Sequence, residues 1–551
     1  MKGRRVLSMI APAVAIVLAT VLVHAGDLRG GHHAAGRFSG DRYLGAVDPR
    51  TQLQFGFALR MRQAALERYA QGVAGPMRAP ALSPAEIGRR FGISSAQLAR
   101  LASQLARDGI AIDESFPQRT ELLLSAPAAR VEQLLGVRLG LFADARGVVF
   151  HKPLATPAVP AALRGAVTAI TGLNTKRIDV TAAVPQGGLR GPDLANLYDI
   201  TGLTARGLDG SGQTVAVFSE DTFQDSDIAT FDQTRNISGA PPVQRVQFEG
   251  PVQFQSGDGA TEVDLDIEVI RELAPKAQIL DYEAPCCGAA AFSVGIDRIV
   301  KDGRAKLVNF SYGQCELELT PFSELHAADA SFAAAAAAGV TVFVASGDQG
   351  AYECQRDDTT NHTLSVPWPS SSPNVVSVGG TYVDVRQDGS RLDEVGWEDV
   401  LSHAGGGGGV STLFPRPGWQ AGVPGINNGY TTNPPRRQTP DVAADADGAS
   451  GYSVYSQGQD AMVGGTSAAA PLWTGSFVLI SQLAARSHVR LPFIAPLLYR
   501  AAARDPSAFY DVTLGGNRFY SAGPGWDYST GLGVPDMAAL ARDVLAEAQG
   551  H

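Results

Sequence analysis

Cysteine is scarce in this sequence. Its 551 residues include only four cysteines, and no two of them are spaced as C-x-x-C. So few cysteines exclude a small fold held together by disulfides, and the missing C-x-x-C argues against a zinc or redox site. A bond between the adjacent Cys286 and Cys287 would be strained. We therefore expect these two to form disulfides with Cys315 and Cys354, and the sequence leaves both pairings open.

Charged residues are also scarce, at 18% of the chain, and acidic residues outnumber basic ones by 55 to 45. The acidic balance argues against nucleic acid as the main partner. Residues 1–190 hold 24 basic and 12 acidic side chains, a charge of +12, which leaves −22 for residues 191–551. This asymmetry predicts two domains whose opposite charges attract near neutral pH. Acidification protonates carboxylates and would therefore weaken the attraction.

Long apolar runs are absent except at the N-terminus, so we expect no other stretch to span a membrane. There, basic residues within Lys2–Arg5 precede an apolar stretch, Val6–Val23, which is followed by the small residue Ala25. This order predicts that residues 1–25 are a signal peptide for export, with a retained membrane anchor as the alternative. Either would place the rest of the chain outside the cytoplasm, secreted, extracellular or periplasmic.

Residues 44–180 alternate short helices and strands. Ser83-Pro84-Ala85-Glu86 is a capping box with proline at the first helical position, and a second helix is expected from Ser94 or Ser95 to Gly109. These features predict a small α+β domain without a catalytic pattern. Residues 181–192 are rich in glycine, proline and small residues and are predicted to be a linker that is cut. The remaining expected elements of this domain are strands at Glu121–Leu124, Val137–Leu141 and Val148–Phe150 and a helix at Pro127–Leu135.

Beyond residue 192, apolar runs typical of buried strands alternate with helical segments. Such alternation predicts an α/β domain with a parallel sheet flanked by helices on both faces. Functional groups of such a sheet gather beyond the carboxyl ends of its strands. The glycine run Gly405–Gly409 is expected to be a flexible surface loop. The predicted strands are Thr214–Phe218, Gln278–Tyr282, Lys306–Phe310 and Val340–Ala345, and the clearest helices are Val263–Leu273 and Phe322–Ala338.

One serine lies in a sequence suited to a nucleophile. In Gly464–Pro471, small residues lead to Ser467, and the apolar stretch that follows predicts a buried helix with Pro471 in its first turn. A serine at a helix N-terminus lies where the helix dipole favours developing negative charge, and the glycines would admit a substrate backbone. The alternative is an ordinary helix-capping serine.

A histidine base for this serine is missing, because none of the nine histidines follows the H-G-T context of a subtilisin. Two carboxylates are candidates instead. Glu262 and Asp266 are four residues apart in a predicted helix and therefore share one face. Two like charges this close, partly desolvated, raise one pKa, so the pair keeps a proton and acts as base and then acid in acidic solution. The alternative is a solvated acidic helix start.

A third candidate is Asp348, in Val344–Gly350, where a predicted strand runs into a glycine-containing turn. An aspartic acid at this place donates a hydrogen bond to an oxyanion only while it is protonated, which requires acidic solution or strong desolvation. The alternative is a turn aspartate that caps its own backbone.

Together, in this order and context, the three features resemble the sedolisins, or serine-carboxyl peptidases, a family with a subtilisin-like fold, and in particular its kumamolisin-type members. The resemblance implies that Ser467 is the nucleophile, Glu262 the general base, Asp266 its carboxylate partner and Asp348 the acid of the oxyanion hole. It also implies that residues 193–548 are the peptidase domain and residues 44–180 a ferredoxin-like inhibitory prodomain. Further segments that carry it are Asn309–Gly313, Ser372–Thr381, Gly407–Ser411 and Pro440–Ala444.

The C-terminal segment resembles the calcium loop of the same family. By that resemblance, one Ca²⁺ ion would be held by the carboxylates of Asp511 and Asp527 and by the backbone carbonyls of Val512, Gly523 and Gly525. Hard oxygen ligands and tight glycine turns suit Ca²⁺, and the spacing is not that of an EF-hand. The alternative is two turn aspartates near glycines.

The sequence therefore predicts a secreted, self-processing proenzyme that hydrolyses peptide bonds of proteins or peptides at acidic pH, as an endopeptidase or a tripeptidyl-peptidase. Its own prodomain would be its intramolecular inhibitor. One alternative from another class is a catalytically inactive, calcium-binding protein that keeps the fold, and another is a neutral-pH enzyme that uses histidine. Relatives place polar groups behind the base, and here Glu220 or Asp221 would either support the base or face solvent.

Overall fold

The computed structural model describes residues 42–73, 79–143, 149–175, 188–248, 250–285, 289–319, 324–386, 389–426 and 432–550. The predicted signal peptide or anchor, residues 1–25, lies outside the described residues. So do Cys286, Cys287 and most of the predicted linker. The last linker residues are described: Leu189 pairs with the strand at Tyr452, donating its N–H to the Gly451 carbonyl at 2.7 Å.

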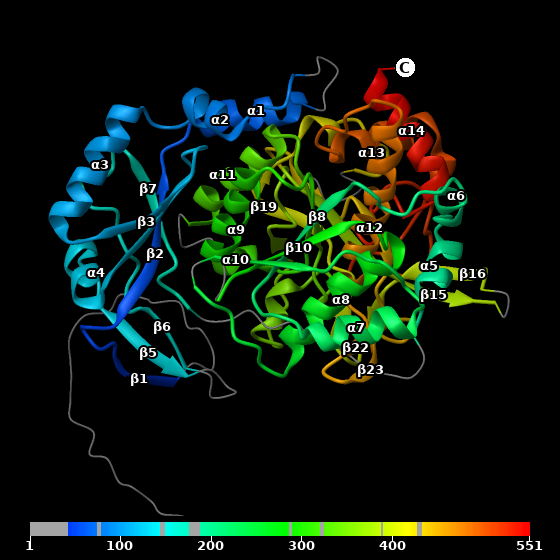
Figure 1. The fold of residues 1–551 in the computed structure, drawn as a ribbon, viewed down its shortest axis with the longest axis horizontal. Helices are drawn as coiled ribbons and strands as arrows, with labels where there is room; N and C mark the ends of the chain where they lie inside the picture. Colours follow the sequence, from blue (N-terminus) through cyan, green and yellow to red (C-terminus); the bar gives the residue numbers. More distant parts are fainter. Residues whose placement is uncertain are drawn as a thin grey trace, which may run out of the picture. The chain divides into compact units, whose positions relative to one another are not determined.

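The N-terminal domain is a small α+β structure, as predicted (Figure 1). One sheet has the order β3–β4–β2–β7, which is the strand order of a ferredoxin-like βαββαβ motif. The capping box at Ser83 and the helix start at Ser94 are confirmed. Ser94 also forms a capping box, and Gly109 ends this second helix in the left-handed conformation (φ 75°). A second sheet has the order β1–β5–β6. The elements are β1 Arg42–Ala46, β2 Gln52–Leu59, α1 Gln63–Val73, α2 Pro84–Phe91, α3 Ser95–Asp108, β3 Ala111–Ser115, β4 Glu121–Pro127, α4 Ala128–Leu135, β5 Leu139–Ala143, β6 Val149–Pro153 and β7 Val167–Thr171.

The larger domain is built on an eight-stranded, mostly parallel sheet, which confirms the predicted α/β class. The strand order is β16–β15–β13–β11–β8–β10–β9, with β21 paired to β15 and only the β15–β16 pair antiparallel. Helices α8 and α12 pack against each other, and so do α9 and α11 (Figure 1). These elements are β8 Thr214–Ser219, β9 Gln244–Gln247, α8 Asp258–Leu273, β10 Gln278–Glu283, α9 Ala289–Asp302, β11 Leu307–Phe310, α11 Glu324–Ala337, β13 Thr341–Ala345, β15 Val376–Val385, β16 Arg391–Gly396, β21 Val442–Asp445 and α12 Thr466–Arg486.

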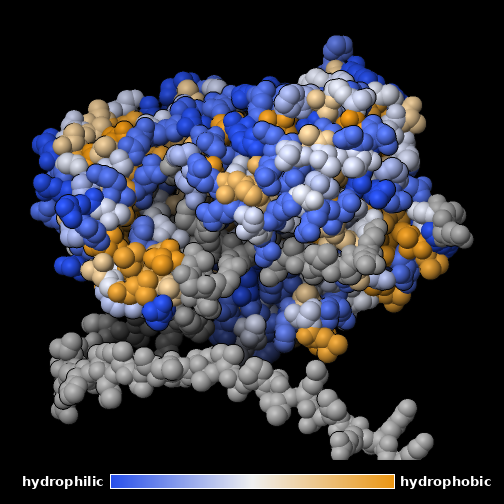
Figure 2. Space-filling view, turned by 60° about the horizontal axis from the view of Figure 1, so that its bottom comes forward, coloured by the Kyte–Doolittle hydropathy of each residue, from blue (hydrophilic) through white to orange (hydrophobic). Residues whose placement is uncertain are grey.

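Smaller elements surround this sheet. A short pair, β12 with β14, and a hairpin, β22 with β23, lie near the site described below. In the space-filling view the visible face is mostly hydrophilic with a few separate hydrophobic patches (Figure 2). The smaller elements are α5 Gly191–Leu197, α6 Thr201–Thr204, α7 Asp225–Thr234, β12 Gln314–Cys315, α10 Glu316–Leu319, β14 Pro367–Trp368, β17 Glu398–Asp399, β18 Ala404–Gly405, β19 Gly409–Pro415, β20 Arg436–Thr439, β22 Tyr452–Ser456, β23 Gln459–Val463, α13 Ala495–Arg504, β24 Phe509–Tyr510, β25 Val534–Pro535 and α14 Met537–Gln549.

Two local expectations were wrong. Helix α12 begins at Thr466, so Pro471 is its sixth residue and lies in the second turn. Proline has no N–H, and the carbonyl of Ser467 therefore lacks its usual helical donor four residues on. The glycine run Gly405–Gly409 is buried, not a surface loop, because the Gly407 N–H donates to the Gly347 carbonyl at 2.7 Å.

Helix α12 is the central helix of the core. Among the described residues it alone is long and apolar enough to cross a membrane by length and composition, but 89% of that window is buried inside the protein. The helix packs between the strands of the sheet and helix α8. Strand β13 is buried at every position, and its Phe343 packs against Phe477 of the helix. The apolar stretch is therefore core.

Two carboxyl groups are buried where the N-terminal domain meets the larger domain. Glu121 of β4 accepts hydrogen bonds from Thr171 and, at 2.7 Å, from Ser293 of α9, while Asp297 of α9 accepts one from Thr120. Each domain thus supplies one carboxyl to a hydroxyl of the other. Burial raises the pKa of both carboxyls to about 7. A side chain at Gly56 of β2 would lie 2.1 Å from the Glu121 and Thr171 oxygens, so glycine is required there.

The ion pairs at the rim of this contact run against the expected charge pattern. Glu114 of the N-terminal domain pairs with Arg298 at 2.8 Å and with Lys301, both on α9. Here the acid belongs to the positively charged part of the chain and the bases to the negatively charged part. The net charges of the two parts therefore do not describe how this edge of the contact is held.

Candidate active site

The four predicted catalytic residues come from three segments that meet at one end of the sheet. Glu262 and Asp266 lie one turn apart on α8, Asp348 follows β13, and Ser467 is the second residue of α12. All four are buried, with between 0 and 5% of each residue exposed. Because α8 packs against α12, the carboxyl groups of α8 reach the start of α12, which places all four in one cluster.

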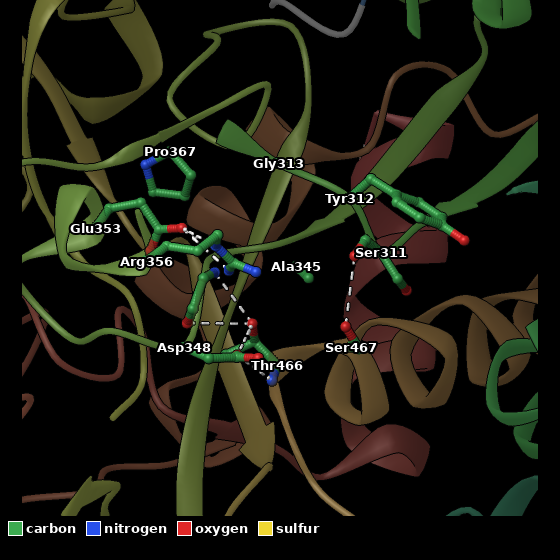
Figure 3. A pocket seen from close by; sticks show the side chains of 11 residues that line it. Ser311, Tyr312, Gly313, Ala345, Asp348, Glu353, Arg356, Pro367, Thr466 and Ser467 are labelled. Carbon is green, nitrogen blue, oxygen red and sulfur yellow. Dashed lines mark hydrogen bonds and ion pairs between the residues drawn. The ribbon is translucent and has the colours of Figure 1, made fainter. Parts of the chain in front are cut away.

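The Ser467 hydroxyl lies between a carboxyl group and a carbonyl. The hydroxyls of Ser467 and Ser311 are close enough to the Glu262 carboxyl to lower its pKa. The Ser467 hydroxyl donates a hydrogen bond to the carbonyl oxygen of Ser311 at 3.4 Å; this contact is dashed in Figure 3. A carboxyl group in contact with the serine hydroxyl can accept its proton, which is the requirement for a general base.

A chain of polar side chains supports Asp266. Ser311 donates to Asp266 Oδ1 at 2.7 Å, Asn309 donates to the Ser311 hydroxyl at 3.1 Å, and Thr474 donates to Asn309 at 3.2 Å. Asn309 and Ser311 belong to a segment that the family resemblance indicated. Thr474 was missed, although it lies seven residues after Ser467 and hence on the same helix face.

Burial raises the pKa of both Glu262 and Asp266; the charge of Asp348 raises that of Glu262 further, and the charge of Glu262 raises that of Asp266. For Glu262, the nearby hydroxyls of Ser467 and Ser311 and the cation of Arg356 act in the opposite direction and favour the charged form. Asp266 is fully buried and feels the charge of Glu262. Of the two, Glu262 is therefore the candidate for the base and Asp266 the candidate for holding a proton.

Asp348 is held by the residue that precedes the nucleophile. Its Oδ1 accepts hydrogen bonds from the backbone N–H and the hydroxyl of Thr466, both at 2.8 Å. A Cβ on Gly465, which has φ 114°, would lie 3.0 Å from Asp348 Oδ2. Asp348 therefore caps the start of α12 and not its own turn.

The cluster opens into a small pocket beside the serine (Figure 3). Two lining residues, Glu353 and Arg356, were missed by the sequence analysis, because a buried ion pair three residues apart in a turn has no distinctive sequence pattern. Their ion pair is 3.1 Å long. The pocket is lined by Ser311, Tyr312, Gly313, Ala345, Gly347, Asp348, Glu353, Arg356, Pro367, Thr466 and Ser467.

Polar groups also lie behind the base. Ser219, at the end of β8, donates to Asp281 of β10 at 2.6 Å, and the charge of Asp281 raises the pKa of Asp266. Glu220 and Asp221 are buried, at 5 and 6% exposed, so neither faces solvent. Among the described residues, no histidine lines the pocket, which removes the support for a histidine base.

The predicted disulfide pattern is wrong for the two cysteines in the described part of the chain. Cys315 and Cys354 are bonded to each other, not to Cys286 or Cys287. The reason is spatial: β12 packs directly against the turn Glu353–Arg356, which contains Cys354.

The predicted calcium ligands lie around one loop. Asp511 accepts a hydrogen bond from the Gly525 N–H, and Asp527 accepts one from the Gly523 N–H, both at 2.9 Å. The two carboxylates thus bracket the loop whose carbonyls complete the predicted set. Burial raises the pKa of Asp527 to about 6. In the described ranges, no group of three or more His, Cys, Asp or Glu side chains is arranged to hold a metal.

Comparisons with known proteins identify both parts of the chain. Residues 39–176 match the pro-kumamolisin activation domain and residues 255–531 match the subtilase family. Kumamolisin of Bacillus sp. (strain MN-32) is 34% identical over 475 residues, which cover 80% of this chain and 81% of the relative. Sedolisin of Pseudomonas sp. (strain 101) is 38% identical over 310 residues, 54% of this chain and 51% of the relative.

A solved structure agrees with these relatives. It is Pseudomonas sedolisin, a serine-carboxyl proteinase, complexed with two molecules of pseudo-iodotyrostatin; it superimposes with a TM-score of 0.58 at 31% identity and covers 66% of this chain and 98% of that one. Human tripeptidyl-peptidase 1 is 30% identical over 362 residues, 62% of this chain and 61% of the relative. The chain therefore belongs to the sedolisin, or serine-carboxyl peptidase, family and is a serine peptidase with an N-terminal kumamolisin-type activation domain.

Proposed function

We propose that the chain is an acid-acting peptidase in which Ser467 is the nucleophile, Glu262 the general base, Asp266 its proton-holding partner and Asp348 the acid of the oxyanion hole. The observation that carries this proposal is the burial of Glu262 beside the serine at the N-terminus of α12, with Asp266 one turn behind.

The geometry supports a complete catalytic cycle. Glu262 takes the proton of Ser467 as its hydroxyl attacks the substrate carbonyl, and then passes that proton to the leaving amine. Asp348 Oδ1 already accepts two hydrogen bonds, so a proton on Asp348 belongs on Oδ2, from where it is donated to the oxyanion. The dipole of α12 adds to this stabilisation. Water then releases the acyl group, with Glu262 again as base.

Two physical reasons favour an acidic working pH. Asp348 donates a hydrogen bond only while it holds its proton. In addition, burial raises the pKa of Asp264 to about 8 and that of Asp329 to about 7. A carboxyl whose folded-state pKa is raised contributes stability fully below its unfolded pKa, and that contribution is lost as the pH rises through the folded value. The fold is therefore more stable in acidic than in alkaline solution.

The pH dependence of proteolysis tests the proposal. We expect the purified full-length chain to digest a denatured protein at about pH 4 and not at about pH 8, because the proposed hydrogen bond to the oxyanion requires the protonated form of Asp348. The N-terminal domain should be lost during the same acid incubation, and mass spectrometry would detect this loss. Digestion at pH 8 would favour a histidine-type enzyme, and no digestion at either pH would favour an inactive protein of the same fold.

We also propose that residues 1–25 export the chain, as a cleaved signal or an anchor, and that the activation domain inhibits the peptidase until it is removed. Substrates are then extracellular or periplasmic proteins and peptides. The basic start, apolar run and small residue of the N-terminal segment support export. The packing of the activation domain on α9 and α11 supports inhibition.

A calcium ion would fit the loop bracketed by Asp511 and Asp527, because the predicted ligands are hard carboxylate and carbonyl oxygens. The bound ion would offset the negative charge of the two carboxylates. We expect 1 mM Ca²⁺ to raise the Tm by about 5 °C relative to chelator.

Mg²⁺ at the same concentration is the ion control, and Asp460→Asn, at an exposed hairpin position, is the matched variant control. Asp511→Asn and Asp527→Asn should abolish the Ca²⁺-dependent rise in Tm, whereas Asp460→Asn should keep it. An unchanged Tm of the unsubstituted chain with Ca²⁺ would contradict the calcium site.

A further inference from the structure

The disulfide Cys315–Cys354 joins two walls of the active-site pocket. Its cysteines are 39 residues apart in the sequence. Cys315 follows Gly313 by two residues, and Cys354 lies between Glu353 and Arg356. Gly313, Glu353 and Arg356 all line the pocket, so this covalent link lies directly beside the site.

The wall on the Cys315 side is firmly anchored. Cys315 is paired with Pro367, and Gln314 with Trp368, in the β12–β14 ladder. Trp368 is fully buried and packs against Phe332 with ring centroids 5.4 Å apart. Pro367 and Gly313 therefore have fixed positions on this side of the pocket.

The wall on the Cys354 side is a short turn held by polar contacts. The Cys354 N–H donates to the Ser365 hydroxyl at 3.1 Å, and Arg518 donates to Gln355 at 2.7 Å. The disulfide is the covalent tie between this turn and the anchored wall. A single helical turn has little stability of its own, so its position depends on such ties.

The turn Glu353–Arg356 places charged side chains near the proposed catalytic carboxyls. A Cβ on Gly347 would lie 2.2 Å from Glu353 Oε2, which shows how closely Glu353 packs beneath the residue before Asp348. The Arg356 cation favours the charged form of Glu262, and Asp348 and Arg356 interact electrostatically. A small displacement of the turn would change both the pocket and the field at Glu262 (Figure 3).

We propose that the Cys315–Cys354 disulfide is a positioning element of the active site, which holds the Glu353–Arg356 pair against Asp348 and Glu262. The inference rests on the proposed catalytic roles of those two carboxyls. It predicts that the bond contributes to catalysis separately from its contribution to stability. Misplacement of supporting groups by about 1 Å costs about 100-fold in rate in other enzymes.

The test is the double variant Cys315→Ala/Cys354→Ala, assayed on a peptide substrate well below its Tm. We expect kcat/KM per titrated active site to fall about tenfold to a hundredfold. The pH–rate profile should also shift toward higher pH, because a displaced Arg356 no longer favours the ionised form of Glu262. The matched control is Leu540→Ala, which opens a cavity in the remote helix α14 and destabilises the fold without touching the pocket.

A second variant separates positioning from stability. In an Arg356→Gln background the same cysteine substitutions should have little further effect on the pH profile, since the cation that the bond positions is already gone. An unchanged kcat/KM and pH profile in the cysteine variant, with an active unsubstituted enzyme, would overturn this inference alone. If the unsubstituted enzyme were inactive at every pH, the proposed function would fail instead.

Discussion

Replacement of Ser467 by alanine is expected to abolish peptide-bond hydrolysis and to leave the proenzyme uncleaved. The variant lacks the α12 hydroxyl that lies beside the proposed base Glu262, so we expect turnover of a denatured protein to fall by about 10⁴-fold or more. SDS gels of the purified chain, incubated at about pH 4, measure both digestion and self-processing.

Substitutions of the carboxyls should reduce the rate less than Ser467→Ala does. Glu262→Gln removes the base and should cost about 10²- to 10⁴-fold in kcat, while Asp348→Ala removes one oxyanion donor and should cost about 10²- to 10³-fold. Asp264→Asn is the matched control. Its carboxyl is buried on the same helix but accepts a hydrogen bond from Ser456, away from the nucleophile, so activity should be kept. Full activity of Ser467→Ala would refute the assignment.

Acid should tighten, not loosen, the docking of the prodomain through its buried carboxyls. The pKa of Glu121 is raised to about 7 from 4.5, and that of Asp297 to about 7 from 3.8. When the pKa of a carboxyl is higher in the docked state than in the free state, its protonation stabilises docking. This stabilisation is fully present below about pH 4 and is lost as the pH rises through about 7. Each carboxyl should weaken docking about tenfold to a hundredfold between pH 5 and pH 8.

The groups around Glu121 and Asp297 support tighter docking in acid. Thr120, Thr171, Ser293, Ser331 and Gln118 surround them, and all are neutral. The charge of Glu121 itself raises the pKa of Asp297. Elsewhere at the contact, Glu67 acts electrostatically on Asp329, and Glu114 pairs with Arg298 and Lys301 at the rim.

The measurement uses full-length Ser467→Ala protein that a second protease cuts once at an engineered site within residues 181–187. Dissociation of the two cut parts on dilution would be followed at pH 5, 6.5 and 8. In the Glu121→Gln/Asp297→Asn protein the pH dependence should flatten, since neither group titrates. Glu114→Gln is the control, because it weakens the rim while leaving the buried carboxyls in place. Weaker docking at pH 5 than at pH 8 would contradict the prediction.

The fold and the catalytic cluster were predictable because local patterns determine them. Buried parallel strands are continuous apolar runs, and the four-residue spacing of Glu262 and Asp266 places both on one helix face. Even the N-termini of the helices that begin after Ser83 and Ser94 follow from the capping boxes at these serines. The family resemblance added the assignment of roles, which spacing alone left ambiguous.

Features that depend on distant contacts were not predictable. Cys315 meets Cys354 because β12 packs against the turn Glu353–Arg356, and nothing in the cysteine spacing shows that contact. The Glu353–Arg356 pair is buried because it packs under Gly347, and a charged turn in a sequence is usually solvated. Pro471 was misplaced by one turn because helix ends are set by the residues that cap them, here Gly465 and Asp348.

Gly56 gives the docking contact an evolutionary signature. The Glu121 and Thr171 oxygens fill the space where a side chain at position 56 would begin. Any larger residue there must therefore be accompanied by a smaller or absent acid at position 121. Homologues that lack this proton-dependent docking should have replacements at both Gly56 and Glu121. Homologues that retain it should keep glycine at position 56 and an acid at position 121. A comparison of many prodomain sequences could thus sort the family by how its inhibitors respond to acid, without measuring one of them.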